Sequence, residues 1–259
     1  MSNHPFDLAS AAFNEMMHQG FHPDLSPGTK EQVDSIRANG SRPPAGTRDL
    51  RGLLWSSIDN DTSRDLDQIE WAERIPGGIR VRVGIADVSA SVAKDSPIDK
   101  HAAEQTRTVY TATRNFPMLP NELSTDLTSL NENEDRPAMV VEFVVDADGN
   151  LQQQSIYRAL VHNRAQLAYS KVGPWLEGKA DPDPKVAASP ELQAQLRLQD
   201  EAARAIRNGR IKQGALDFNR IEADPVVIDG QVQDIKAVLR NRATNLIEDF
   251  MVAANETMA

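Results

Sequence analysis

The 259-residue sequence contains no cysteine, which excludes disulfide bonds, thiolate metal sites and cysteine nucleophiles and fits a reducing compartment. No apolar run approaches the roughly 18–20 residues that a membrane-spanning helix needs. Residues 1–5 carry neither the basic segment nor the apolar segment of a secretory signal. We therefore expect a cytoplasmic protein that has no contact with a membrane.

Basic residues are also scarce: 28 Lys and Arg stand against 38 Asp and Glu, a formal net charge of −10. Affinity for a nucleic-acid backbone comes chiefly from Lys and Arg, so this balance argues mildly against a protein whose main task is to grip phosphates. Acidic residues that bind a metal ion would give the same balance. The net charge alone therefore does not decide between these classes of protein.

Turn-forming residues divide the chain. Prolines and glycines are dense in residues 1–47, which predicts an N-terminal leader that is only partly helical, and residues 48–259 form the expected main domain. Within that domain, residues 79–85 alternate between apolar and polar positions, as a half-buried strand does. Further strands are expected at 139–145 and 151–160, joined by a hairpin at 146–150.

Other segments predict a second hairpin around residues 226–232 and three helices, which run from Ser96 to about Val109, from Leu192 to Ile206 and from Leu246 to Met258. Ser96 is a good N-cap, and Pro97 suits the first helical position. Hairpins and helices follow one another without a regular β-α-β order. The expected fold class is therefore α+β.

The most informative segment is an acidic loop with the spacing Asp59-x5-Asp65-x-Asp67. In an extended chain, residues two apart point to the same side, so Asp65 and Asp67 can converge, and Asp59 can return to them across a turn. Three close carboxylates repel one another unless a cation lies among them. Oxygen ligands favour Mg2+, with Mn2+ as an alternative, and such an ion could act on a phosphodiester.

Taken alone, the acidic loop leaves other interpretations open. The acids of such a loop are more often a solvated turn than a metal site. The Asp-x-Asp motif also occurs in glycosyltransferases, which hold nucleotide sugars through a metal.

With its flanks, however, the loop resembles the signature of the ribonuclease II (RNB) family. The similar blocks keep their order along the chain: SIDNDTSRDLDQ at 57–68, VGIADVS at 83–89, SPID at 96–99, TVY at 108–110, PMLPNELS at 117–124, LTSLN at 127–131, GALDF at 214–218 and LIEDFMVAAN at 246–255. The resemblance covers about four-fifths of the chain, from about residue 47 to its end.

This resemblance implies an RNB-type catalytic domain, a mixed or antiparallel curved sheet surrounded by helices. It further implies a Mg2+-dependent hydrolytic exoribonuclease that degrades single-stranded RNA from the 3′ end and releases nucleoside 5′-monophosphates. The matching positions assign Asp59, Asp65 and Asp67 to catalysis and, with Gln68, to the metal. By the same matching, Tyr110 and Phe218 stack on the terminal bases and Glu248 lies near the 3′-terminal ribose.

Two departures from the family pattern bear on activity. The family usually has a fourth aspartate where this chain has Gln68, which supplies an amide oxygen but no charge, and another acid such as Asp61 could contribute. The family domain also normally continues beyond Ala259, so we expect either a fragment of a longer protein, which would supply a C-terminal segment, or a shortened member. The alternative to an enzyme is therefore a non-catalytic RNB-like module that binds RNA or regulates.

Overall fold

The structure, a computed structural model, describes residues 6–40, 43–216, 222–228 and 231–259. The chain forms two units, each assembled from segments that are distant in sequence. The larger unit consists of residues 41–90, 124–218 and 240–259, and the smaller unit of residues 1–40, 91–123 and 219–239. The first 40 residues of the predicted leader thus belong to the smaller unit, and the division at residue 47 stays a prediction.

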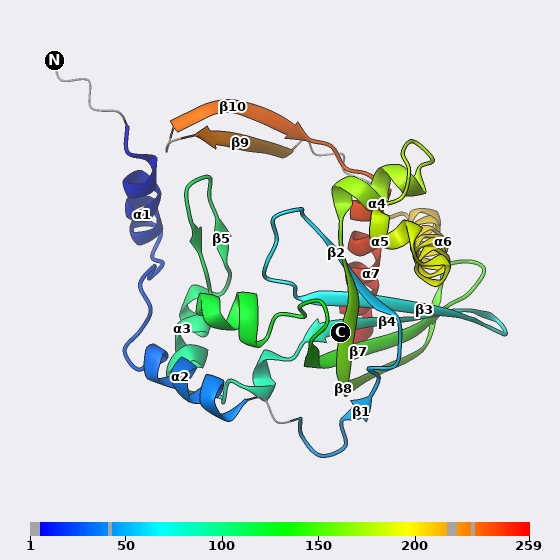
Figure 1. Ribbon diagram of the computed structural model, residues 1–259, viewed down its shortest axis with the longest axis horizontal. Helices are drawn as coiled ribbons and strands as arrows, with labels where there is room; N and C mark the ends of the chain where they lie inside the picture. Colours follow the sequence, from blue (N-terminus) through cyan, green and yellow to red (C-terminus); the bar gives the residue numbers. More distant parts are fainter. Residues whose placement is uncertain (1–5, 41–42, 217–221, 229–230) are drawn as a thin grey trace. The chain divides into compact units, whose positions relative to one another are not determined.

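In the described part of the larger unit, six strands form one mixed sheet (Figure 1). Their order is β1-β8-β2-β3-β4-β7, and they are β1 (Arg48–Asp49), β2 (Trp55–Asp59), β3 (Gln68–Ile75), β4 (Gly78–Ala86), β7 (Asp135–Val145) and β8 (Leu151–Ala168). The long β8 also pairs with β7 over residues 151–162, and its residues 163–168 run parallel to β2. Strand β8 therefore joins the two sides of the sheet.

The alternation that predicted a strand at 79–85 is confirmed by β4. Its apolar residues Ile79, Val81 and Val83 are buried in the core. Arg82 lies on the opposite face, where its guanidinium donates to Glu142 on β7 at 2.6 Å. The hairpin predicted at 146–150 also forms, although β7 and β8 extend beyond the predicted strands.

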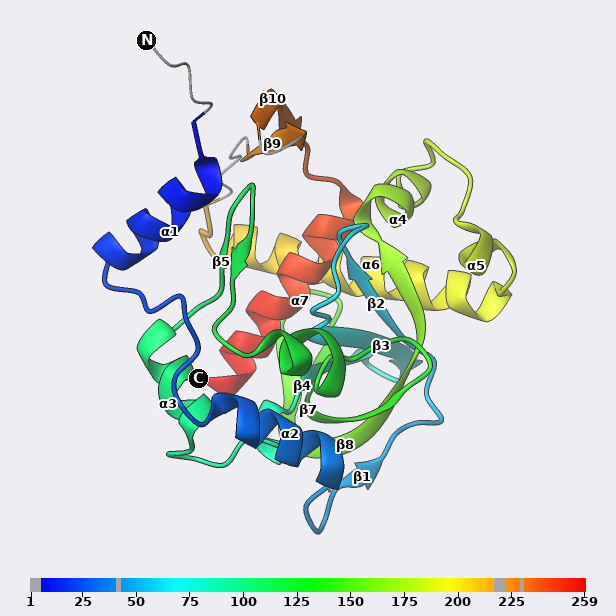
Figure 2. The ribbon, with the colours of Figure 1, turned by 60° about the vertical axis from the view of Figure 1, so that its left-hand side comes forward.

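Four α-helices are described in the larger unit: α4 (Tyr169–Leu176), α5 (Pro184–Ala187), α6 (Pro190–Lys212) and α7 (Arg242–Met258). Helix α6 begins at a Ser189 cap, and α7 begins at a capping box formed by Asn241 and Thr244. Helices α6 and α7 pack on each other, α6 packs on β3 and β4, and α7 on β7 (Figure 2). In the described ranges, no helix has both the length and the apolar character to span a membrane.

The larger unit has two clusters of buried apolar residues. One joins the sheet to the helices through residues such as Ile58, Ala72, Phe143, Leu246 and Phe250. The other contains Trp55, Leu66, Ile69 and Trp71 with residues of β7 and β8. Both clusters include residues next to the acidic loop, so packing fixes the backbone on either side of it.

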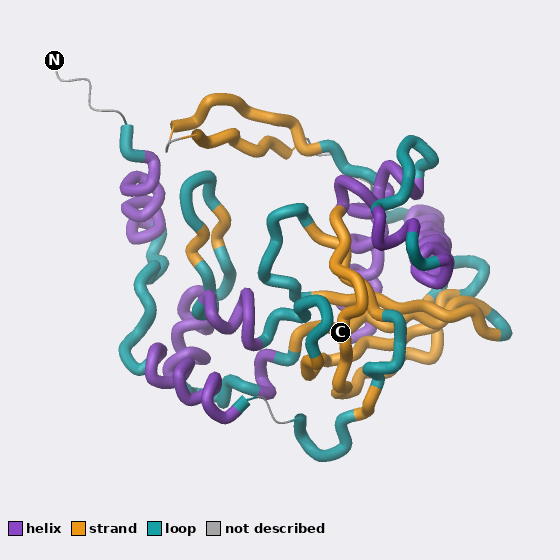
Figure 3. The backbone as a smooth tube through the Cα atoms, viewed as in Figure 1, coloured by secondary structure: helices purple, strands orange, loops and turns teal. Residues whose placement is uncertain are grey.

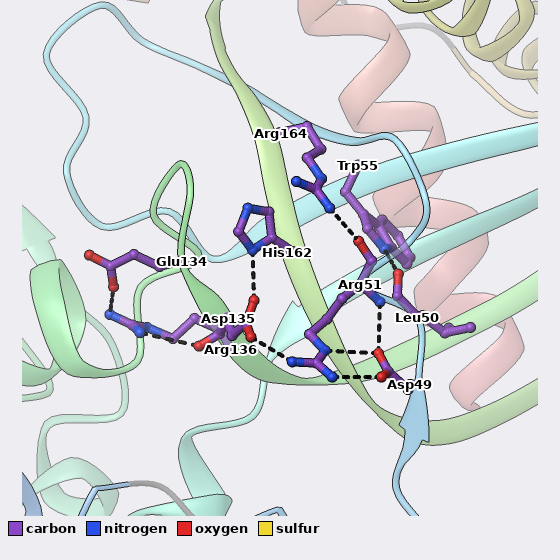
Figure 4. Close-up of polar contacts among 9 residues, drawn as sticks. All are labelled: Asp49, Leu50, Arg51, Trp55, Glu134, Asp135, Arg136, His162 and Arg164. Carbon is purple, nitrogen blue, oxygen red and sulfur yellow. Dashed lines mark hydrogen bonds and ion pairs between the residues drawn. The ribbon is translucent and has the colours of Figure 1, made fainter.

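Polar contacts fix the segment that leads into β2 (Figure 4). The Arg51 guanidinium donates to both oxygens of Asp49, at 2.9 and 2.7 Å, and to Asp135 on β7 at 2.8 Å. It lowers the pKa of the Asp49 carboxyl to about 2. The Trp55 indole then donates to the Leu50 carbonyl at 2.9 Å. These contacts hold the start of the strand that ends at the acidic loop.

The described part of the smaller unit contains helices and two hairpins. Its elements are α1 (Leu8–His18), α2 (Thr29–Asn39), α3 (Pro97–Gln105), the hairpin of β5 (Val109–Tyr110) and β6 (Asn115–Phe116), and the hairpin of β9 (Glu222–Ile228) and β10 (Gln231–Val238). Gln32 ties α2 to α3, because its amide donates to Ser96 Oγ and accepts from the Ile98 amide. The predicted leader is thus partly helical.

One helix boundary was predicted wrongly. The helix that begins after Ser96 ends at Gln105 rather than at about Val109. Thr106 adopts the left-handed conformation with φ of 62°, which ends the helix, and Val109 then pairs with Phe116 in a short hairpin. The α+β fold class itself is confirmed by the mixture of antiparallel and parallel pairings with helices.

The turn between β7 and β8 provides a test of this packing. Gly149 has a φ of 84°, and a Cβ there would overlap the carbonyl oxygen of Ala205 on α6. We expect Gly149→Ala to lower the free energy of unfolding by about 2–4 kcal/mol, from backbone strain and overpacking together. Urea denaturation measures this loss.

Gly77, in the turn between β3 and β4, is the matched control. Its φ is 92°, but a Cβ there would meet nothing within 4 Å. Gly77→Ala should therefore cost only the backbone strain, about 1 kcal/mol. Equal losses in the two variants would show that the contact with α6 does not matter.

Candidate active site

The acidic loop joins the end of β2 to the start of β3 (Figure 3). Leu66, in the middle of the loop's acids, is buried and anchors it. The Leu66 amide donates to Ser129 Oγ at 3.0 Å, and its carbonyl accepts from the Leu130 amide at 2.8 Å. The positions of Asp65 and Asp67, which flank Leu66, are therefore set by the core rather than by solvent.

Asp59 ends β2 and is half-buried. Its Oδ1 accepts from the Asn60 amide at 2.7 Å and from Ser63 Oγ at 2.9 Å. Burial raises the pKa of the Asp59 carboxyl, and the charge of Asp65 raises it further against these hydrogen bonds. Asp65 is thus close enough for its charge to act on the Asp59 carboxyl.

Asp67 immediately precedes β3 and keeps an exposed side chain. Crowding by surrounding protein atoms raises its pKa first, and the charges of Asp59 and Asp65 raise it further. The three acids predicted to act together are therefore coupled electrostatically in the folded chain. A positive charge placed among them would relieve this repulsion.

Gln68, the fourth predicted metal ligand, is the first residue of β3 and is buried. Its amide nitrogen donates to the Ile58 carbonyl at 3.3 Å, so its amide oxygen is the atom that it could offer to a cation. Gln68 therefore contributes a dipole to the site and no charge.

Two further residues belong to this site, and sequence reasoning did not identify them. Glu70, two residues along β3, is fully buried, and burial together with the charges of Asp67 and Asp59 raises its pKa well above the usual range. Tyr169 begins α4, and burial followed by the charges of Asp59, Glu70 and Asp67 raises the pKa of its phenol. The phenol therefore stays protonated and able to donate a hydrogen bond beside these acids.

The register of β2 and β8 explains how Tyr169 reaches the site. Asp59 pairs with Ala168 in the parallel ladder, so the next residue of the chain, Tyr169, begins its helix beside the end of β2. The Tyr169 carbonyl accepts from the side chain of Asn241, the N-cap of α7, at 3.0 Å. No local spacing in the sequence relates residue 169 to the acidic loop.

Within the described ranges, no three or more His, Asp or Glu side chains already lie in an arrangement that would hold a metal ion. The donor chemistry nevertheless fits a hard divalent cation, because Asp59, Asp65 and Asp67 offer carboxylate oxygens that repel one another. Both oxygens of Glu70 are also buried without a hydrogen-bond partner. The metal site therefore stays a prediction with which the charges of these residues agree.

The predicted aromatic residues are described only in part. Tyr110 lies on β5 in the smaller unit, and 63% of its surface is exposed, as a residue that stacks on a base would require. Phe218 lies outside the described residues. The assignment of both to RNA binding stays a prediction.

Glu248 lies on α7 and forms an ion pair with Arg240. The two residues border a cavity of about 130 Å³, lined by Arg207, Arg210, Ile211, Ala215, Leu216, Arg240 and Glu248. Asp249 beside it is buried and pairs with Arg207 and Arg210 at 3.7 and 3.2 Å. The cavity thus combines guanidinium groups, which suit phosphate, with a carboxylate, which suits a hydroxyl.

The raised pKa of Asp67 predicts an effect on stability. When the pKa of a carboxyl is higher in the folded than in the unfolded chain, the folded chain loses stability as the pH rises through the folded pKa. In EDTA at pH 7, Asp67→Asn should therefore raise the melting temperature by about 1–3 °C, a small value because solvent screens an exposed group. Calorimetry should show the gain vanish below about pH 4, where the carboxyl is protonated in both states. A melting temperature of Asp67→Asn equal to that of the unaltered chain at pH 7 would contradict the repulsion of Asp67 by its neighbouring acids.

Comparison with known proteins places this geometry in a family. The RNB domain model matches residues 47–259. Exoribonuclease 2 of Edwardsiella piscicida is 36% identical over 211 residues, which make up 80% of this chain and 32% of that protein.

Solved structures of other proteins have a similar fold. Mycoplasma genitalium RNase R in complex with ribose-methylated single-stranded RNA has a TM-score of 0.88 and 26% identity, covering 98% of this chain and 39% of that one. The same RNase R in complex with double-stranded RNA has a TM-score of 0.87 and 26% identity, covering 98% of this chain and 45% of that one.

The chain thus spans about a third of the length of this curated relative. The matched residues contain the acidic loop, the coupled acids and the sheet that holds them. The resemblance inferred from the sequence blocks is confirmed, and the chain belongs to the RNB domain family.

Proposed function

We propose that this chain is the larger part of the catalytic domain of a 3′–5′ exoribonuclease. The enzyme hydrolyses single-stranded RNA with the help of Mg2+, for which Mn2+ can substitute, and releases nucleoside 5′-monophosphates. The observation that carries the proposal is the charge coupling of Asp59, Asp65 and Asp67 in one loop of an RNB domain. A cytoplasmic location stays a prediction.

The residues of the site have different roles in the proposed reaction. Asp59, Asp65 and the amide oxygen of Gln68 would hold the divalent ion, which supplies positive charge to a phosphodiester and acidifies water. Asp67 orients the attacking water and takes up its proton, a task for which a raised pKa suits a carboxylate. The Tyr169 phenol stays protonated beside these acids and is available there as a hydrogen-bond donor.

RNA recognition is assigned to separate residues. The exposed ring of Tyr110 and the ring of Phe218 would stack on bases without regard to sequence, because every base presents a π-face. Glu248, in the arginine-lined cavity, would accept a hydrogen bond from a ribose 2′-hydroxyl and so favour RNA over DNA.

The alternative function is a non-catalytic RNB-like module that binds or regulates RNA. The observation that favours it is Gln68, which brings no charge to a site that depends on acids. Such a module would bind single-stranded RNA and leave it intact with Mg2+. Release of mononucleotides would exclude it.

The catalytic role of Asp67 predicts a separation of hydrolysis from binding. Asp67→Asn should lower the rate of RNA hydrolysis by about 10²–10⁴-fold, the usual contribution of a positioned acid or base, and leave RNA affinity nearly unchanged. The assay follows mononucleotide release from 3′-labelled single-stranded RNA with Mg2+ and with EDTA. Asp61→Asn is the matched control, because the Asp61 carboxylate accepts from Ser170 Oγ at 2.9 Å and is exposed. If Asp67→Asn abolished binding as well, the carboxylate would be structural.

The stacking role of Tyr110 predicts a loss of affinity that depends on the ring. Tyr110→Ala should weaken binding of single-stranded RNA by about 1–3 kcal/mol, the contribution of one stacked base, and Tyr110→Phe should retain most of it. Phe218→Ala should act similarly. Fluorescence anisotropy with a labelled oligonucleotide measures these affinities, and equal binding by Tyr110→Ala and the unaltered chain would remove Tyr110 from the RNA site.

A further inference from the structure

Glu70 is the least expected residue in the interior of the larger unit. Its side chain is 0% exposed, and neither carboxyl oxygen has a hydrogen-bond partner. A buried carboxylate without a partner costs several kcal/mol, so a chain does not keep one without a reason. A purely structural glutamate would be tied to a base or to backbone amides.

The surroundings of Glu70 contain other unsatisfied polar atoms. Ser56 lies directly opposite Glu70 in the ladder between β2 and β3, and its hydroxyl is buried without a partner. Gln199 on α6 donates from its amide nitrogen to the Glu70 carbonyl at 3.4 Å, and its amide oxygen is also buried without a partner. Four unsatisfied polar atoms in one part of an apolar interior indicate that a polar or charged group belongs beside them.

Glu70 is also placed correctly to act on the acidic loop. Residues two apart in a strand share a face, so Glu70 follows Gln68 on the same side of β3. The charges of Asp67 and Asp59 act on its carboxyl, which puts the three side chains in one electrostatic cluster. Gln68 brings no charge to that cluster, and Glu70 is the next residue on its face that can.

We propose that Glu70 supplies to the divalent ion the carboxylate that Gln68 does not, so that Asp59, Asp65, Asp67 and Glu70 together carry the negative charge of the site. The proposal rests on the proposed metal-dependent function and adds a residue to it. In the family the fourth carboxylate usually lies at position 68, at the edge of the loop. In this chain it would lie two residues further along the same face of β3, at Glu70 inside the fold. A buried carboxylate held by packing would be ordered before the ion arrives.

Asp61 is the competing source of this charge. It lies in the same loop, but it is exposed and its carboxylate is engaged by Ser170 on α4. The charges that raise the pKa of Asp59, Asp67 and Glu70 come from one another and from Asp65. Asp61→Asn is therefore the matched control for a change at Glu70.

The test is isothermal titration of the whole chain with MgCl2 alone, without RNA. Glu70→Gln should weaken Mg2+ binding at least tenfold, Asp67→Asn should weaken it as well, and Asp61→Asn should bind as the unaltered chain does. Melting in EDTA should show Glu70→Gln at least as stable as the unaltered chain, because a buried unpaired carboxyl has been removed. Glu70→Met, of similar size, replaces Glu70→Gln if that variant does not fold.

A double variant that places the carboxylate at position 68 instead of position 70 shows whether Glu70 acts as a metal ligand or has only a structural role. Gln68→Asp restores a carboxylate to the same face of β3, so its combination with Glu70→Gln should recover most of the Mg2+ affinity lost in Glu70→Gln. Binding by Glu70→Gln or Glu70→Met equal to that of the unaltered chain would overturn the proposal. So would a double variant as weak as Glu70→Gln alone.

These outcomes are distinct from a failure of the proposed function. If the unaltered chain bound no Mg2+, or if RNA hydrolysis continued in EDTA, the metal-dependent mechanism would fall and the role of Glu70 with it. If the unaltered chain and Asp67→Asn behaved as expected and only Glu70→Gln did not, the mechanism would stand and Glu70 alone would be excluded.

Discussion

The site depends on the confinement of like charges where three strands meet. Asp59 ends β2, Asp67 precedes β3, and the parallel pairing of β2 with β8 fixes the backbone on the third side. The carboxylates cannot move apart to relieve their repulsion, because Leu66 between them is held in the core. Burial raises the pKa values of Asp59 and Asp67, the charges of neighbouring carboxylates raise them further, and the remaining means of relief are protonation or a cation. The packed interior offsets the cost of holding them together.

The same junction explains why the helix-covered face of the sheet is polar at one place. β2 and β3 share a single paired position, Ser56 with Glu70, and beyond it β3 lacks the backbone partners that β2 would supply. Two glutamines of α6 take over this task, since Gln195 exchanges hydrogen bonds with the Ala72 backbone at 3.0 and 2.6 Å and Gln199 donates to the Glu70 carbonyl.

Periodicity in the sequence predicted the elements that bury one regular face, such as β4, α6 and α7, and the motif blocks predicted the family and the acidic loop. Periodicity failed where the conformation of a single residue sets the end of an element, as at Thr106, whose left-handed φ ends α3 early. It could not find Tyr169, because only the long-range register of Asp59 with Ala168 brings that residue to the loop. Nor could it find Glu70, since nothing local shows that this side chain is buried in the interior.

The structure shows where part of the net charge of −10 is located. Part of the negative charge is concentrated in the acidic loop, where it would repel RNA in the absence of a cation, so in the proposed function attraction must come from local groups rather than from the overall field. The cavity between α6 and α7 provides such groups, because Arg207, Arg210 and Arg240 outnumber Glu248 and the buried Asp249. The proposed exoribonuclease can therefore be acidic overall, provided that its basic residues lie where phosphates would pass and the proposed divalent ion neutralises its acids.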